Sequence, residues 1–485
     1  MSLLHRTTRW LLILLAFGAS LLAAVVLVFA IQARHRLPEL RPWHRLALQD
    51  FTAGAPGAPA TFQDYRRLED RLAAEVRGRI LDNPAAADKM VYGRYNPASV
   101  PSHLALDTPY NHSYELTPAG EIQCGVLLVH GLSDSPYSMR TIGEIFQRQG
   151  CYVVVLRLPG HGTVPSGLLK VRWQDWYGAV VLAAKQVAAR ASGKPLLAGG
   201  HSTGAALVSL YSVRAQADSS LPRPARIYLV SPAIGISKAA VLTNILASLS
   251  FLPRFEKSAW LDVLPEFDPY KYNSFPVNAA NQIHRLTRVL RAELLDAVEK
   301  KQLAGMPKVM VFQSLVDSTV TSAEVVHGLL ELLPRGDNEL VVFDINREEK
   351  IQGFLAAGPV EQLKRLRAAG DLPYRVTIIG NPSEATDRIA SMSRIAGSND
   401  FVQEDLPLTW PAGIFSLGHV ALPFPPDDPV YGLEPAAGEG PRFNLGGIMA
   451  RGESGALVVP LGMFSRLRCN PFFSVIQKKI EESLR

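Results

Sequence analysis

The residues at 200–204 read Gly-His-Ser-Thr-Gly, a pattern that places a serine in a sharp turn. A short apolar run precedes the pattern, and a helix-competent apolar stretch follows it at 205–213. Strand, tight turn and helix is the context in which such a serine becomes a nucleophile. Both glycines have a steric reason, since side chains at 200 and 204 would crowd a strained turn. We therefore expect Ser202 to be a reactive nucleophile; the alternative is a serine that only caps a buried helix.

A serine hydroxyl is a weak nucleophile at neutral pH, so Ser202 needs a histidine base that is itself held by a carboxylate. In a nucleophile elbow of this kind the chain order is serine, acid, histidine. Of the eleven histidines, His327 and His419 follow a strand expected at 308–314, and His327 lies within a helical pattern. His419 lies in a loop marked by glycine and proline, where a base can be accessible. We therefore predict that His419 is the base.

The acid is expected at the end of a strand, because sites of parallel sheets gather at the carboxyl ends of their strands. Asp317 directly follows the strand expected at 308–314 and is the predicted acid. Asp344 ends the next expected strand and is the alternative. Asp427 and Asp428 follow the histidine and are disfavoured by chain order.

Acyl transfer also needs hydrogen-bond donors aimed at the oxygen that becomes negatively charged. One expected donor is the backbone N–H of Thr203, at the N-terminus of the helix that follows the nucleophile. The other is the backbone N–H of Leu132, in a glycine-bearing loop after a strand. His130 in the same loop is expected to brace the loop rather than to act as a second base.

Strand and helix patterns alternate along the chain, which predicts a mostly parallel sheet wrapped by helices. A helix is expected at 62–80, where apolar residues recur at helical spacing. The expected strands lie near 125–130, 152–158, 195–200, 226–231, 308–314 and 339–344.

The N-terminal stretch from Trp10 to Ile31 has no charged residue and would extend about 33 Å as a helix, enough for a bilayer core of about 30 Å. We expect an uncleaved transmembrane anchor at 10–32 and a single-pass membrane protein. A cleaved signal peptide is the alternative, although its apolar region is usually shorter. More arginines follow the span than precede it, which favours a cytoplasmic domain. An export anchor would instead place the domain outside the cytoplasm, and we slightly favour that side.

The rest of the chain divides into a linker and one large domain. Residues 33–60 are rich in proline, alanine, glycine and arginine, so a linker is expected there. The remaining residues, 61–485, form the predicted hydrolytic domain. About 75 residues separate the strands at 226–231 and 308–314, far more than a helical crossover needs. We expect a cap insertion at about 236–305, with an apolar helix at 239–252 that either covers a hydrophobic pocket or simply packs on the domain.

These motifs together resemble the α/β-hydrolase superfamily, and most closely its monoacylglycerol lipase and serine aminopeptidase-like branch. The resemblance is carried by the loop His130 to Pro136, the stretch Leu-Pro-Gly-His-Gly at 158–162, the elbow at 200–204, Asp317 and His419. It implies an α/β-hydrolase fold over roughly residues 110–430, a cap that shapes an acyl pocket, and an acyl-enzyme on the serine. One departure is an unusually long path from Asp317 to His419, which we assign to an extra insertion at about 346–410.

Two cysteines open neighbouring segments of this pattern. Cys124 and Cys151 each begin an expected strand, and adjacent strands would bring them within disulfide range. The resemblance implies that these two strands are adjacent. Two buried free thiols are the alternative.

The function that these residues favour is a membrane-anchored serine hydrolase that cleaves carboxylic esters, with lipid-derived esters as candidate substrates. An amidase, peptidase or acyltransferase could use the same triad, and a binding protein with a vestigial site is a third hypothesis. The net charge of +6 and the absence of basic repeats argue against a nucleic-acid partner. No metal-binding spacing occurs, so no cofactor is expected. The sequence leaves the oligomeric state open.

Overall fold

A sheet of ten strands, all among the described residues, forms the centre of the computed structural model. The structure describes residues 10, 12–14, 16–18, 20, 24, 37–235, 253–368, 370, 372–398, 400–435, 443–448 and 458–485. The strands stand in the order β1-β3-β2-β4-β5-β8-β9-β10-β11-β12. Their bounds are β1 Tyr114–Leu116, β2 Cys124–Val129, β3 Cys151–Leu156, β4 Leu196–His201, β5 Arg226–Val230, β8 Lys308–Ser314, β9 Glu339–Phe343, β10 Arg375–Gly380, β11 Arg388–Arg394 and β12 Val402–Thr409.

The central strands β2, β3, β4, β5, β8, β9 and β10 pair in parallel, whereas β1, β11 and β12 are antiparallel to their neighbours. All residues of β2, β3 and β4 are buried. Continuous apolar runs of this kind are expected where helices cover both faces of a parallel sheet. Each of the six strands expected from the sequence is present.

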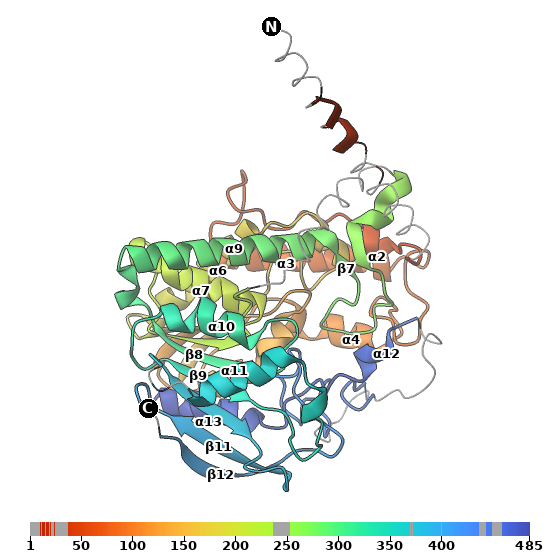
Figure 1. Cartoon of the computed structure of the whole chain (residues 1–485). Helices are drawn as coiled ribbons and strands as arrows, with labels where there is room; N and C mark the ends of the chain where they lie inside the picture. Colours follow the sequence, from red (N-terminus) through yellow and green to blue (C-terminus); the bar gives the residue numbers. More distant parts are fainter. Residues whose placement is uncertain are drawn as a thin grey trace.

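Helices cover both faces of the sheet (Figure 1). Helices α3, α6, α7, α9, α10 and α11 contribute to one apolar layer, and α5 and α13 contribute to the other. The helix bounds are α2 Pro42–Arg45, α3 Phe62–Val76, α4 Val100–Asp107, α5 Arg140–Arg148, α6 Trp173–Ala191, α7 Thr203–Ala217, α9 Val277–Glu299, α10 Ser322–Gly328, α11 Ala357–Ala368, α12 Leu461–Phe464 and α13 Phe473–Ser483. The mostly parallel, helix-covered sheet is the predicted α/β-hydrolase architecture.

The long path between Asp317 and His419 extends the sheet. After β9 the chain forms α11 and then adds β10, β11 and β12 outward from β9. The first of these strands, β10, pairs in parallel with β9. The outer strands β11 and β12 lie at the edge of the molecule near α13 (Figure 1). The segment at 346–410 is therefore largely a lateral extension of the sheet.

The predicted cap is only partly covered by the structure and is not confirmed. Its apolar helix at 239–252 lies outside the described residues. The described remainder contains a pair of short strands, β6 Trp260–Asp262 and β7 Phe275–Pro276, followed by the long helix α9. Helix α9 packs on α6 and α7.

The sequence predicted a membrane-spanning helix at 10–32 and a single-pass membrane location. The structure contradicts this prediction, which is wrong. Within the described part of the chain, no helix combines the length and the apolar character needed to cross a bilayer. Within this range, residues 10, 12–14, 16–18, 20 and 24 are described, and the others lie outside the described residues.

The segment predicted as a linker packs against the domain. The side chains of Leu40, Trp43 and Phe51 are buried. Asp50 forms a bidentate ion pair with Arg157, whose side chain is 1% exposed. A composition rich in proline and glycine thus does not prevent residues 37–60 from forming part of the packed structure.

Cys124 and Cys151 form a disulfide between β2 and β3. The two strands are parallel neighbours, and these two residues face each other at the start of both. Their Cα atoms are 4.5 Å apart, within the range that a disulfide can bridge. The third cysteine, Cys469, is free and buried.

Candidate active site

Ser202 occupies the sharp turn between β4 and α7. Its backbone has φ 53° and ψ −113°, a conformation that residues with a side chain rarely adopt. The flanking glycines make the turn possible: a Cβ on Gly200 would overlap the backbone of Gly204, and a Cβ on Gly204 would overlap the carbonyl of Val129. Strain of this kind concentrates at functional sites. The geometry is that of a nucleophile elbow.

His419 and Asp317 are brought together from positions far apart in the chain. The imidazole Nδ1–H of His419 donates a hydrogen bond to Asp317 Oδ2 at 2.8 Å. The other carboxylate oxygen accepts from the backbone N–H groups of Thr319 and Val320 at 2.8 and 2.9 Å. These bonds fix the carboxylate and orient the ring, as the third member of a triad does.

Burial and hydrogen bonding set the protonation of this pair. Burial alone would raise the pKa of Asp317, but the hydrogen bond and charge of His419 and the two backbone donors hold it below its usual value. Burial lowers the pKa of His419, and this effect outweighs the opposing influence of Asp317. The site therefore rests with an ionised carboxylate and a neutral imidazole, the state that a general base requires.

Two strands hold the loop that carries His419. Ser314, at the end of β8, donates a hydrogen bond from its hydroxyl to the carbonyl of Leu417 at 2.8 Å. Asn346, just after β9, donates from its backbone and its side chain to Phe415 and Ile414. His419 itself is buried, which differs from the expected exposed base. Its position is set by the ends of the sheet strands.

The alternative acidic and basic residues have other partners. Asp344 accepts two hydrogen-bonded contacts from the guanidinium of Arg347, at 2.9 and 2.8 Å. His327 lies in α10 and pairs with Glu331 at 2.7 Å. Asp428 accepts from the hydroxyl of Tyr137 and pairs with Arg140. Asp427 is exposed and takes part in none of the contacts described for Asp344, His327 and Asp428.

A cavity of about 290 Å³ lies beside two of the three expected catalytic residues. Ser202 and His419 line it, together with Leu132 and Thr203, whose backbone N–H groups were expected to stabilise an oxyanion. Thr203 begins α7, so its N–H lies among the helix-end donors that have no partner within the helix. A Cβ on Gly131 would lie 3.2 Å from the Cβ of Ser202, so glycine permits the loop to approach the nucleophile closely.

His130 has the bracing role expected for it. Its Nδ1 lies 2.8 Å from the carbonyl of Gly131, and its Nε2 accepts from the backbone N–H of Leu158 at 3.0 Å. Burial lowers its pKa to about 4, so the ring stays neutral and makes both bonds with one tautomer. The residue thus ties the expected oxyanion loop to the end of β3.

Several groups at the site were not foreseen from the sequence. His201, inside the elbow, lies 3.6 Å through its Nδ1 from Asp134 and 3.3 Å through its Nε2 from the carbonyl of His419. Lys271 and Arg466 also line the cavity. The position of His201 next to the nucleophile was the one available signal. Within the described residues, no group of three or more histidine, cysteine or acidic side chains could hold a metal ion.

Comparisons with known proteins found one curated relative that matches a short part of the chain. A stretch of 56 residues is 41% identical to the thermostable monoacylglycerol lipase of Bacillus sp. (strain H-257), and it covers 12% of this chain and 22% of that lipase. The chain thus spans about a fifth of the length of that curated relative.

The solved structures that match the chain include a protein from work on LipS and LipT, two metagenome-derived lipolytic enzymes. The two chains are 22% identical, the match covers 54% of this chain and 99% of that chain, and the TM-score is 0.39. The monoacylglycerol lipase of Paleococcus ferrophilus is 15% identical, with 48% and 88% coverage and a TM-score of 0.36.

The family comparison is the broadest of the three. A model described as "Alpha/beta hydrolase family" matches residues 126–430, which include every expected site residue. The monoacylglycerol lipase that matches over 56 residues agrees with the predicted resemblance to the monoacylglycerol lipase-like branch. This protein therefore belongs to the alpha/beta hydrolase family, which confirms the family predicted from its motifs.

Proposed function

We propose that the protein is a serine hydrolase that cleaves carboxylic esters through an acyl-enzyme on Ser202, with His419 as the base and Asp317 as the acid. The single observation that supports this most strongly is the 2.8 Å hydrogen bond between His419 and Asp317 beside a cavity that Ser202 also lines. A strained serine, a neutral buried histidine and an ionised carboxylate are the components of nucleophilic acyl transfer.

The proposed reaction proceeds in two halves. The Ser202 Oγ attacks the ester carbonyl carbon while its proton moves to Nε2 of His419, and the carbonyl oxygen becomes an oxyanion. The backbone N–H groups of Leu132 and Thr203 stabilise that charge. Collapse of the intermediate expels the alcohol, which takes the proton from His419 and leaves an acyl-serine. A water molecule then repeats the sequence, and the carboxylic acid leaves.

The cavity lining favours an ester with an apolar acyl group. Leu132, Phe275, Ile283, Val320 and Val420 contribute apolar surface beside the nucleophile. Such surface binds a hydrocarbon chain by removing it from water. The lipase relatives are consistent with a lipid-derived ester as the substrate class.

Covalent labelling with a fluorophosphonate probe tests the nucleophile. We expect the purified protein to be labelled and to hydrolyse short-chain p-nitrophenyl esters. The Ser202→Ala variant should lose both, since it removes the attacking oxygen. The exposed Ser220 offers a control, and Ser220→Ala should keep both activities. Persistent labelling of Ser202→Ala, or no labelling of the folded wild-type protein, would contradict the proposal.

Matched substrates test the reaction class. An ester and an amide with the same acyl group differ only in the leaving group, and we expect much faster turnover of the ester. Faster turnover of the amide would assign the triad to an amidase or peptidase instead. Product formation that requires a second alcohol would assign it to acyl transfer.

A further inference from the structure

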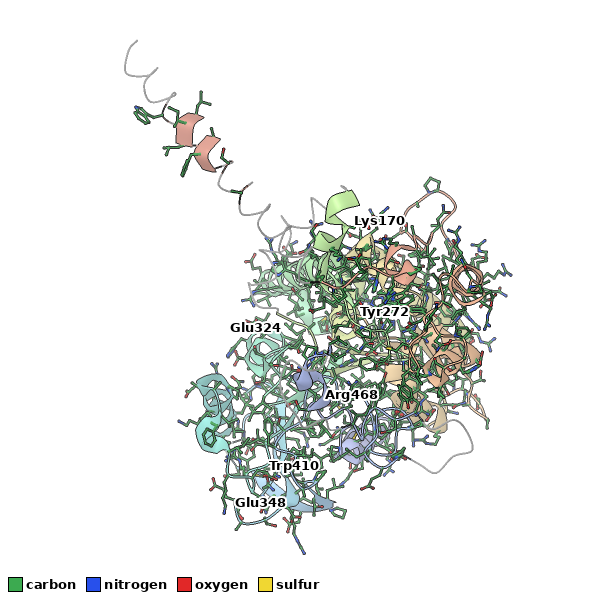
Figure 2. All side chains as sticks on the ribbon, turned by 90° about the vertical axis from the view of Figure 1, so that its right-hand side faces the viewer. Lys170, Tyr272, Glu324, Glu348, Trp410 and Arg468 are labelled. Carbon is green, nitrogen blue, oxygen red and sulfur yellow. A yellow bond between two sulfur atoms is a disulfide. The ribbon has the colours of Figure 1, made fainter. Side chains whose placement is uncertain are left out.

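A second cavity lies directly beside the proposed active site. It also has a volume of about 290 Å³ and shares a wall with the first cavity. Figure 2 labels Tyr272 and Arg468, two residues of its lining that come from distant parts of the chain. The residues common to both cavities are Asp134, His201, Lys271, Phe275, Val420 and Arg466. A substrate could thus occupy both spaces at once.

The second cavity is more charged than the first. Its lining includes three carboxylates and three cationic side chains: Asp134, Asp262, Asp268, Lys271, Arg466 and Arg468. Of these six residues, three also line the first cavity, and all three belong to the shared wall: Asp134, Lys271 and Arg466. The two spaces therefore suit chemically different parts of one substrate.

Two of the carboxylates are already engaged. Asp134 faces His201, with 3.6 Å between its Oδ2 and the ring Nδ1. Asp268 accepts from the hydroxyl of Tyr431 at 2.5 Å, and its other oxygen lies 3.7 Å from Arg468. Arg468 in turn donates to the carbonyl of Met463. Asp262, the third carboxylate, is exposed.

Lys271 and Arg466 differ from these paired groups. Among the described residues, no carboxylate lies within ion-pair distance, 4.0 Å, of either side chain. Lys271 still acts on its surroundings: its charge contributes to the lowered pKa values of Asp134 and His419, and it opposes the burial that raises the pKa of Asp268. An ammonium group that affects the proposed base stands close to the reacting centre.

The backbone around Lys271 is fixed. Its N–H donates to the buried Asp268 at 3.1 Å. The next residue, Tyr272, donates from its backbone N–H to the carbonyl of Ser133 at 2.8 Å. That carbonyl belongs to the residue after Leu132, one of the proposed oxyanion donors. The loop that carries the lysine is thus tied to the loop that would carry the oxyanion donor, and such preorganisation favours a binding role.

We propose that Lys271 and Arg466 form an anion-binding subsite, so that the substrate is an ester with an apolar acyl group and an anionic group on its alcohol part. The acyl chain would lie in the apolar cavity beside Ser202, and the anionic group would lie in the second cavity. Carboxylates and phosphates both accept charge-assisted hydrogen bonds from ammonium and guanidinium groups. This inference rests on the proposed ester hydrolysis and narrows its substrate class.

Three hexanoyl esters separate the possibilities. Monohexanoylglycerol is neutral, the hexanoyl ester of glyceric acid carries a carboxylate, and the hexanoyl ester of glycerol 3-phosphate carries a phosphate. We expect the wild-type protein to have a higher kcat/KM for at least one anionic ester than for the neutral ester. The preferred one distinguishes a carboxylate from a phosphate.

Variants at the subsite test its residues. The quantity to compare is the kcat/KM for an anionic ester divided by the kcat/KM for the neutral ester. Lys271→Met and Arg466→Met should each lower this ratio about tenfold or more, because each substitution removes a charged hydrogen-bond donor. Lys271→Arg should retain most of the ratio, since the positive charge remains. Lys185, which lines a separate cavity, gives the control variant Lys185→Met with an unchanged ratio.

The possible outcomes are distinct. Fluorophosphonate labelling of each variant reports whether the elbow is folded. If the wild-type protein hydrolyses the neutral ester but the ratio is unchanged in both subsite variants, the subsite is wrong and the hydrolase proposal stands. If no ester is hydrolysed and no labelling occurs, the hydrolase proposal fails and the subsite fails with it. Labelling without hydrolysis of any of the three esters overturns this substrate class alone.

Discussion

The protonation of His419 depends on its burial and on three neighbouring groups. Burial lowers its pKa, Asp317 raises it, and His201 and Lys271 lower it further. The net direction is downward, so the imidazole is neutral at the pH where it must accept a proton. The neutral ring can therefore accept the proton that Ser202 loses, and the Asp317 carboxylate then stabilises the imidazolium cation that forms.

We therefore predict the acid limb of the pH profile. Below the pKa of His419 the ring is protonated and cannot act as a base, so kcat/KM for a neutral ester should fall as the pH decreases through that value. Because the pKa is lowered, the midpoint should lie below 6.5, the usual value for histidine. Measurement of kcat/KM between about pH 4 and pH 8 tests this. A midpoint above 6.5 would contradict the described electrostatics.

The sequence alone was enough to propose the residues that are defined by type, order and local context. Ser202, Asp317 and His419 follow a required chain order, and few histidines could fill the last position. The groups that surround them were not predictable in the same way. Three loops that are far apart in the sequence meet at the cavity and bring together Asp134, Lys271 and Arg466. No local sequence pattern predicts that these loops lie close together.

Among the elements, the unit of β4, elbow and α7 depends on close backbone contact. Gly204 lies in the first turn of α7, and a Cβ on it would lie 2.1 and 2.6 Å from the carbonyl oxygens of Val129 and His130 at the end of β2. The paired strands β2 and β4 therefore approach the first turn of α7 so closely that only a glycine fits at position 204. A side chain at this position has no free space.

Gly204→Ala should consequently displace α7 from β2. We expect a loss of unfolding free energy of about 1–3 kcal/mol, the usual range for overpacking, together with a larger loss of esterase activity because the helix carries the Thr203 N–H. Thermal unfolding and kcat measure the two effects. The matched control is Gly120→Ala, where a Cβ would meet nothing within 4 Å. Equal behaviour of the two variants would contradict the steric explanation of the motif.

The strands added by the insertion show where pattern reasoning reaches its limit. Apolar runs predicted the six buried strands β2, β3, β4, β5, β8 and β9, because helices cover both faces of that part of the sheet. β12 is mostly exposed and rich in polar residues, as befits an edge strand. A polar edge strand lacks the hydrophobic signal on which the predictions depended.

For the whole molecule, the N-terminal segment after residue 36 belongs to the packed structure. Asp50 reaches across to Arg157, and the same arginine also contacts the buried Glu69 at 2.9 Å. Asp50 accepts a further bond from the backbone N–H of Gly160 at 2.7 Å. Composition predicted a linker here because proline and glycine are common in linkers, but the partners of a charged residue over such a distance are not visible in composition.

Asp50→Ala should be strongly destabilising. It removes the bidentate partner of Arg157 and leaves a buried guanidinium with Glu69 as its remaining carboxylate, a change that typically costs about 3–5 kcal/mol. Burial would raise the pKa of Asp50, but Arg157 and the backbone donors hold it below its usual value. Its contribution to stability is therefore present above the unfolded pKa of about 3.8 and is lost as the pH falls through the lower folded value.

Chemical denaturation at pH 7 and at decreasing pH measures this loss. The matched control is Asp337→Ala, which breaks an ion pair with Lys308 whose side chains are both more than half exposed. Surface pairs of this kind contribute about 0–1 kcal/mol, so the control should unfold nearly as the wild-type protein does. The difference in unfolding free energy between the two variants should also narrow at acidic pH, because protonation removes the Asp50 contribution from the Asp337→Ala variant as it does from the wild-type protein. Equal stabilities of the two variants at pH 7 would mean that residues 37–60 are only loosely attached to the domain.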